Sequence, residues 1–171
     1  MKGYIQVYTG DGKGKTTAAL GLALRAAGAG LSVFIGQFIK KGDYSEIKAL
    51  GRFADQITIE QFGEGRFIKG APAPSDIEAA QKGLDRLRSV MGSRQYQVII
   101  LDEANGAVAV ELFPVAALLD LMAAKPDDVE LVITGRSAHP EVIQRADLVT
   151  EMLPIKHYYD EGVQARVGIE K

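Results

Sequence analysis

The chain of 171 residues contains no cysteine, no tryptophan and only two histidines, His139 and His157. Without cysteine there is no disulfide, no thiolate metal site and no cysteine nucleophile, and two histidines far apart in the sequence do not predict a zinc site. The sequence also lacks an apolar run long enough to span a membrane, and its first residues do not resemble a signal peptide. We therefore expect a cytoplasmic protein with no membrane partner.

The sequence also has no excess of positive charge. Twenty Lys and Arg residues stand against 22 Asp and Glu residues, which gives a formal net charge of −2. A nucleic-acid partner attracts clustered basic residues, so we expect a small-molecule partner and no nucleic acid. With 47% hydrophobic residues, a chain of this length can bury a core of ordinary size, which predicts a single domain over 1–171.

Apolar, strand-like runs alternate with helical stretches along the chain. The expected strands are 4–8, 31–38, 57–62, 97–101, 129–134 and 147–152, and the expected helices are 16–27, 44–53, 75–91, 114–124 and 140–145. Strands this apolar are covered on both faces. The pattern predicts a three-layer α/β fold of the P-loop NTPase type, with a mostly parallel central sheet between helices. Function is expected at the carboxyl edge of that sheet.

The strongest motif is a glycine-rich loop between the first expected strand and the first expected helix. Its residues are Gly10, Asp11, Gly12, Lys13, Gly14, Lys15, Thr16 and Thr17. Backbone N–H groups and the helix N-terminus attract phosphate, Lys15 and Lys13 add positive charge, and the Thr16 hydroxyl can bind Mg²⁺. The motif predicts an ATP-binding loop with an exposed Lys15 side chain. Thr9 stands where the usual pattern has its first glycine, so the loop is a variant.

Two acidic residues, Asp102 and Glu103, follow the apolar run 98–101. P-loop folds hold their metal ion with carboxylates at this place, so we expect both residues at a Mg²⁺ site. Adjacent residues on a strand face opposite ways, so one of the two meets the metal while the other orients water or the loop. The alternative is an exposed acidic strand end. The sequence does not decide which carboxylate contacts the metal.

These motifs, with the stretch from Gln37 to Lys40, the stretch from Thr134 to Arg136 and the closing stretch 156–170, resemble the ATP:corrinoid adenosyltransferase family, in its P-loop branch. The resemblance extends over nearly the whole chain. It implies that the Co(I) centre of a reduced corrinoid attacks the 5′ carbon of ATP and expels triphosphate. The substrate would be cobyrinic acid diamide, cobinamide or cobalamin. The family's nucleotide lies reversed in its loop, which is consistent with the variant spacing.

The resemblance also implies the remaining components of the reaction. ATP is the co-substrate, Mg²⁺ or Mn²⁺ is the metal cofactor, and a flavodoxin or another flavoprotein supplies electrons to the corrinoid. The protein is expected to be a homodimer. Because Co(I) is already a strong nucleophile, the enzyme has only to position its substrates and stabilise charge. We expect Lys13, Lys15 and Glu103 to carry this catalytic role.

Four further residues match family positions near the nucleotide or the corrinoid: Arg25, Gln37, Arg136 and His157. Other interpretations are a helix-end charge for Arg25, a structural ion pair for Arg136 and a packed or solvated side chain for His157. A fifth candidate, Phe67, lies in the irregular segment 63–74 and falls between the two positions at which some relatives place Phe and Trp to displace the lower ligand of cobalt. This chain has no Trp, so either Phe67 acts alone there or it only packs the segment onto the domain.

Other functional classes share the loop and the acidic pair. A small-molecule kinase would release ADP instead of triphosphate. A regulatory GTPase is disfavoured because the sequence has no Asn-Lys-x-Asp stretch for reading guanine. A non-catalytic carrier would bind ATP or corrinoid tightly without turnover.

Overall fold

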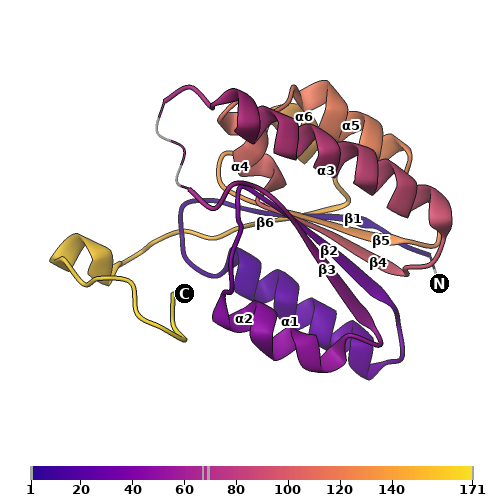
Figure 1. Ribbon diagram of the computed structural model, residues 1–171, viewed down its shortest axis with the longest axis horizontal. Coiled ribbons are helices and arrows are strands. Elements are labelled where there is room, and N and C mark those ends of the chain that lie inside the picture. Colours follow the sequence, from indigo (N-terminus) through magenta and orange to yellow (C-terminus); the bar gives the residue numbers. More distant parts are fainter. Residues whose placement is uncertain (1, 67, 69, 171) are drawn as a thin grey trace.

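Figure 1 shows a computed structural model of the chain, which describes residues 2–66, 68 and 70–170. Six strands form one sheet in the order β3-β2-β4-β5-β1-β6, and every pair of neighbours is parallel. The strands are β1 (Ile5–Thr9), β2 (Val33–Phe38), β3 (Ile57–Phe62), β4 (Val98–Asp102), β5 (Glu130–Thr134) and β6 (Leu148–Glu151). Each lies within one or two residues of its predicted position, so the parallel α/β sheet is confirmed.

Helices cover both faces of the sheet and complete the three layers (Figure 1). On one face lie α1 (Lys15–Gly28) and α2 (Ser45–Leu50), which continues into a 3-10 turn, η1 (Gly51–Phe53). The other face carries α3 (Pro74–Ser93), α4 (Ala104–Ala109), α5 (Val115–Ala123) and α6 (Pro140–Arg145). After β6 the chain forms one more 3-10 turn, η2 (Tyr158–Glu161). No helix within the described ranges is both long and apolar enough to cross a membrane.

Alternation along the central strands sends side chains into two separate cores. In β4, Ile99 and Leu101 pack on the side of α3 and α5, whereas Val98 and Ile100 pack on the side of α1. The next residue in this alternation, Asp102, therefore points toward α1. The same count along β2 and β5 sends one polar side chain at each carboxyl end toward α1. The fold thus brings polar groups from three strands together beside the start of α1.

The packing of α3 on the sheet leaves no space for a side chain at Gly83. A Cβ there would lie 2.5 Å from the ring of Phe62, whereas a Cβ at Gly92 of the same helix meets nothing within 4 Å. We expect Gly83→Ala to lower the free energy of unfolding by about 1–3 kcal/mol, because overpacking outweighs the better helix propensity of alanine. Gly92→Ala is the matched control and should change stability by less than about 1 kcal/mol, in the stabilising direction. Urea unfolding of both variants measures the difference, and equal midpoints would contradict the packing argument.

Candidate functional site

The P-loop, residues 10–17, turns tightly against the chain that follows β6. Gly10 has a φ of +91° and Gly14 a φ of +117°, in the left-handed region that glycine adopts without strain. The N–H of Gly12 donates to the carbonyl of Met152 at 2.7 Å, and a Cβ on Gly10 would lie 2.5 Å from the same oxygen. The glycines are therefore required by the shape of the loop and by its close contact with residue 152.

Lys15 lies inside this loop. The residue is 7% exposed, and its Nζ donates to the carbonyls of Gly10 and Gly12, both at 2.7 Å. Burial and the positive charge of Arg136 lower the pKa of Lys15. The prediction of an exposed Lys15 side chain is wrong, because the turn folds two carbonyls back over the ammonium group.

Thr9, the variant position at the start of the motif, links the P-loop to its neighbours. It is buried at the end of β1, and its hydroxyl accepts a hydrogen bond from the N–H of Ala138 at 3.1 Å. Its carbonyl accepts from the N–H of Met152 at 2.9 Å. A glycine at this position has no side-chain acceptor for Ala138. The departure from the usual spacing thus joins β1 to the loop that follows β5.

The carboxylate of Asp102 is the centre of a buried hydrogen-bond network. Its Oδ1 accepts from the hydroxyls of Thr16 at 2.8 Å and Thr134 at 2.6 Å. Its Oδ2 accepts from Lys40 Nζ at 2.8 Å and from Gln37 Nε2 at 3.0 Å. Gln37, Asp102 and Thr134 converge because each points to the α1 face of its strand. Both carboxylate oxygens already accept two hydrogen bonds each.

Charge and burial act in opposite directions on the ion pair between Asp102 and Lys40. Burial alone would raise the pKa of Asp102, but the charge and hydrogen bond of Lys40 hold that pKa below its usual range. Burial would likewise lower the pKa of Lys40, and Asp102 raises it. The Lys40 ammonium also donates to Thr16 Oγ1 at 3.1 Å. Both groups are therefore charged at neutral pH, and a cation lies beside the P-loop hydroxyl.

Two cavities open at the carboxyl edge of the sheet. The first, about 840 Å³, lies over the P-loop and reaches α1 and α2, and we call it the P-loop cavity. The second cavity, about 580 Å³, is bordered by the segment after β3 and by α4. Three charged residues line both of them: Lys40, Glu103 and Arg136. The two compartments therefore meet at these side chains.

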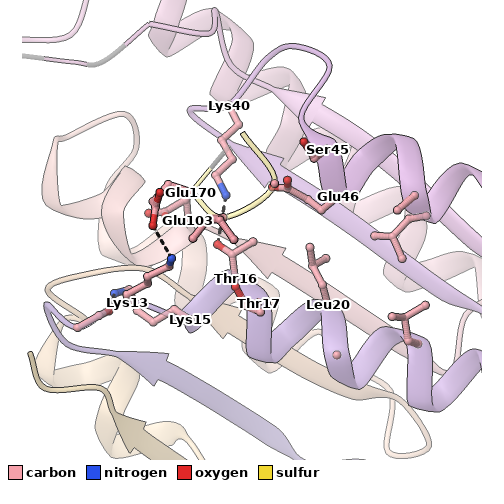
Figure 2. A pocket seen from close by; sticks show the side chains of 18 of the residues that line it. Lys13, Lys15, Thr16, Thr17, Leu20, Lys40, Ser45, Glu46, Glu103 and Glu170 are labelled. Carbon is pink, nitrogen blue, oxygen red and sulfur yellow. Dashed lines mark hydrogen bonds and ion pairs between the residues drawn. The ribbon is translucent and has the colours of Figure 1, made fainter. Parts of the chain in front are cut away.

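Glu103 contrasts with its buried neighbour Asp102. It has a φ of +58° at the start of α4, where the chain turns out of the strand, and its N–H donates to Thr134 Oγ1 at 3.0 Å. Its side chain lies by the P-loop cavity near Lys40 and Thr16 (Figure 2). Burial and the charge of Asp102 raise the pKa of Glu103. A carboxylate with a raised pKa that borders two cavities is a candidate for function.

The structure brings most of the predicted site residues to the P-loop cavity. Those that line it are Asp11, Gly12, Lys13, Gly14, Lys15, Thr16, Thr17, Glu103, Arg136 and His157. Gln37 is fully buried and is joined to the site by its hydrogen bond to Asp102. Arg25 is exposed in the last turn of α1 and lines neither cavity, although its neighbour Leu24 lines the P-loop cavity. Phe67 lies outside the described residues, although its neighbours Arg66 and Ile68 line the second cavity.

Two walls of the P-loop cavity were not predicted. One comes from α2 and η1 and comprises Ser45, Glu46, Ala49, Leu50 and Phe53. The other comes from the C-terminal residues Gly168, Ile169 and Glu170. The sequence predicted a helix at 44–53 but gave it no functional role. The closing stretch had a family likeness, but only His157 received a role, and its Nδ1 accepts from the N–H of Tyr159 at 3.1 Å.

Comparison with known proteins gives a consistent result. Residues 1–170 match the model of a family described as ATP:corrinoid adenosyltransferase BtuR/CobO/CobP. The corrinoid adenosyltransferase of Escherichia coli (strain K12) is 32% identical over 173 residues, which cover 99% of this chain and 86% of that protein. The corrinoid adenosyltransferase CobA of Salmonella typhimurium gives the same identity and coverage. A corrinoid adenosyltransferase of Sinorhizobium sp is 34% identical over 172 residues, or 99% of this chain and 80% of that protein.

Proposed function

Because the chain belongs to the ATP:corrinoid adenosyltransferase family BtuR/CobO/CobP, we propose that it transfers the 5′-deoxyadenosyl group of ATP to the cobalt of a reduced corrinoid. The electron pair of Co(I) forms a bond to the 5′ carbon, the bond from that carbon to oxygen breaks, and triphosphate leaves with the electron pair. Cobyrinic acid diamide, cobinamide and cobalamin are the corrinoids that we expect. The observation that carries this proposal is the pair of cavities that meet at Lys40, Glu103 and Arg136.

We assign the nucleotide to the P-loop cavity. The N–H groups of the loop and the start of α1 attract the triphosphate. Lys13 and Lys15 each add a full positive charge. Lys13 has a side chain 40% exposed, whereas Lys15 is buried. These cations stabilise the negative charge that grows on the triphosphate as the bond to carbon breaks. The expected roles of Arg25 and His157 near the nucleotide or the corrinoid stay predictions.

We assign the corrinoid to the second cavity. Its lining combines apolar side chains such as Ile39, Ile68 and Val110 with the charged residues shared with the P-loop cavity. An apolar wall with a few charged groups suits a large ring bearing polar side chains. With ATP and the corrinoid bound on the two sides of Lys40 and Arg136, cobalt and the 5′ carbon would be held in line. This supplies the positioning that the reaction needs. The lower-face role of Phe67 stays a prediction.

The oxygen donors at the start of α1 fit a magnesium ion. No group of three His, Cys, Asp or Glu side chains gathers among the residues that the structure describes, so a bound ion would keep several water or phosphate ligands, as Mg²⁺ does. Thr16 and Glu103 are the residues that we propose to hold Mg²⁺, or Mn²⁺ in its place. Asp102 would orient Thr16 through its hydrogen bond, because both of its oxygens are already occupied. When bound, the ion would supply positive charge to the triphosphate.

Other parts of the proposal rest on the sequence and the family. A flavodoxin or another flavoprotein as electron donor, a homodimer and a cytoplasmic location stay predictions. The single-domain organisation over 1–171 is supported by one sheet that takes strands from residues 5 to 151.

An anaerobic assay with chemically reduced cobalamin and MgATP tests the proposed function. We expect one triphosphate to be released for each corrinoid adenosylated, with no ADP. Release of ADP would instead favour a kinase. Tight corrinoid binding without any product would indicate a carrier.

A further inference from the structure

The C-terminal segment, residues 153–170, leaves β6 at the carboxyl edge of the sheet and extends past the P-loop (Figure 1). Glu170 closes this segment on itself. Its carboxylate accepts from the N–H of Arg166 at 2.8 Å and from Arg166 Nη2 at 3.1 Å, and the hydroxyl of Tyr158 also donates to it. The segment is otherwise open, since Ile155 is 98% exposed and Val167 is 79% exposed. Backbone hydrogen bonds shape its turns, and the Glu170 carboxylate joins residues 158 and 166 of the segment to its end.

Glu170 also fastens the C-terminal segment to the P-loop. Lys13 Nζ donates to its carboxylate at 2.8 Å and to the hydroxyl of Tyr158 at 3.1 Å. Figure 2 shows the ion pair between Lys13 and Glu170 at the P-loop cavity, and both residues line that cavity. Hydrogen bonds from Arg166 and Lys13 lower the pKa of Glu170 well below its usual range, so the carboxylate is ionised at neutral pH. An anionic group thus already binds one of the two lysines of the loop.

The triphosphate of the proposed nucleotide would bind the same lysine. Lys15 is held by two carbonyls deep in the loop, so Lys13 is the loop cation with a partly exposed ammonium group. A carboxylate on Lys13 repels the phosphates that approach it and occupies one of its three donors. The C-terminal residues Gly168 and Ile169 line the same cavity, so displacement of Glu170 would also move a wall of the site.

We propose that Glu170 is a positioning residue that competes with the triphosphate of ATP for Lys13, so that nucleotide binding releases the C-terminal segment from the P-loop. This inference rests on the proposed function, because it takes ATP as the nucleotide. It assigns Glu170 a role opposite to that of an ordinary binding residue. Removing its charge strengthens ATP binding, whereas removing a residue that closes over ATP weakens it.

Calorimetric titration of MgATP into the protein without corrinoid tests the sign of this effect. Glu170→Gln should lower the Kd for ATP by about two- to fivefold, which is the range expected for a partly exposed ion pair. The matched control is Glu161→Gln, which removes the same charge from an exposed position on η2 and should leave the Kd unchanged. Weaker ATP binding in Glu170→Gln, or equal changes in the two variants, would overturn the proposal.

A double-mutant cycle tests whether Glu170 acts through Lys13. In a Lys13→Met background, Glu170→Gln should have no effect on the Kd for ATP. An unchanged two- to fivefold gain in that background would mean that Glu170 acts through general charge, and would overturn the proposal.

Hydrogen exchange of the C-terminal segment gives a readout that does not depend on affinity. Amides of residues 158–170 should exchange faster after ATP is added to the wild type, and should already exchange faster in Glu170→Gln. Protection of these amides by ATP would contradict release. These measurements need no turnover, so a protein that shows this pattern but produces no triphosphate from reduced cobalamin would contradict the proposed function alone.

Discussion

Replacement of Lys15 by alanine is expected to lower kcat at saturating ATP by at least about a hundredfold. A preorganised contact to the charge that develops in the transition state is typically worth about 3 kcal/mol, and Lys15 carries the buried positive charge at the centre of the loop. The matched comparison is Lys13→Ala, which removes a charge at an exposed position of the same loop. We expect Lys13→Ala to act mainly on the KM for ATP and to reduce kcat by less than about tenfold.

The structure changes the expectation for the stability of Lys15→Ala. Because the ammonium group donates to the carbonyls of Gly10 and Gly12, its removal leaves two acceptors without their partner. We expect the free energy of unfolding to fall by about 1–2 kcal/mol, with the fold retained. Urea unfolding and circular dichroism measure this, beside a steady-state assay of triphosphate release. Near-native kcat in Lys15→Ala would remove the P-loop from the mechanism.

The sheet could be predicted from the sequence because its signals are local. Each strand is a short apolar run, and the strand before the P-loop, β1 (Ile5–Thr9), ends within one residue of its predicted end. The helix α4 (Ala104–Ala109) was not predicted, because its local signal is weak. Six residues that include Gly106 have too little periodicity and too poor a helix propensity to predict a helix. Its position is fixed instead by contact with the loop after β5, where a Cβ on Gly135 would lie 2.7 Å from the N–H of Gly106.

The candidate site could be predicted only where its residues share one motif. Alternation along β4 predicts the direction of Asp102 but not that of Glu103, which has left the strand and has a φ of +58°. The choice between them depends on which donors face each carboxylate. Those donors come from β2, β5 and α1, and the sequence does not give the order of the strands. The contact between Lys13 and Glu170 has no local signal at all, because it joins the first loop to the end of the chain.

Asp102→Asn and Glu103→Gln are expected to damage the protein in different ways. Each oxygen of Asp102 accepts two hydrogen bonds, so an amide group places an N–H donor against donors and leaves the partly buried ammonium group of Lys40 without its counter-ion. Removing one partner of a fully buried ion pair typically costs about 3–5 kcal/mol. Because the Lys40 side chain is 20% exposed, we expect the free energy of unfolding of Asp102→Asn to fall by an amount near the lower end of that range. Turnover should fall with it, because Thr16 loses the acceptor that orients its hydroxyl.

Glu103→Gln should instead spare the fold and change the response to metal. Burial and Asp102 raise the pKa of Glu103 in the folded protein, so its ionisation opposes folding, and this cost develops as the pH rises from the unfolded pKa through the folded pKa. Removing the charge is therefore expected to leave the unfolding free energy at neutral pH unchanged or slightly higher. Activity should fall at least about a hundredfold, and the Mg²⁺ concentration for half-maximal rate should rise. Urea unfolding at pH 7 and Mg²⁺ titration of both variants measure these effects. Equal destabilisation of the two variants with unchanged metal curves would place the ion away from Glu103 and Thr16.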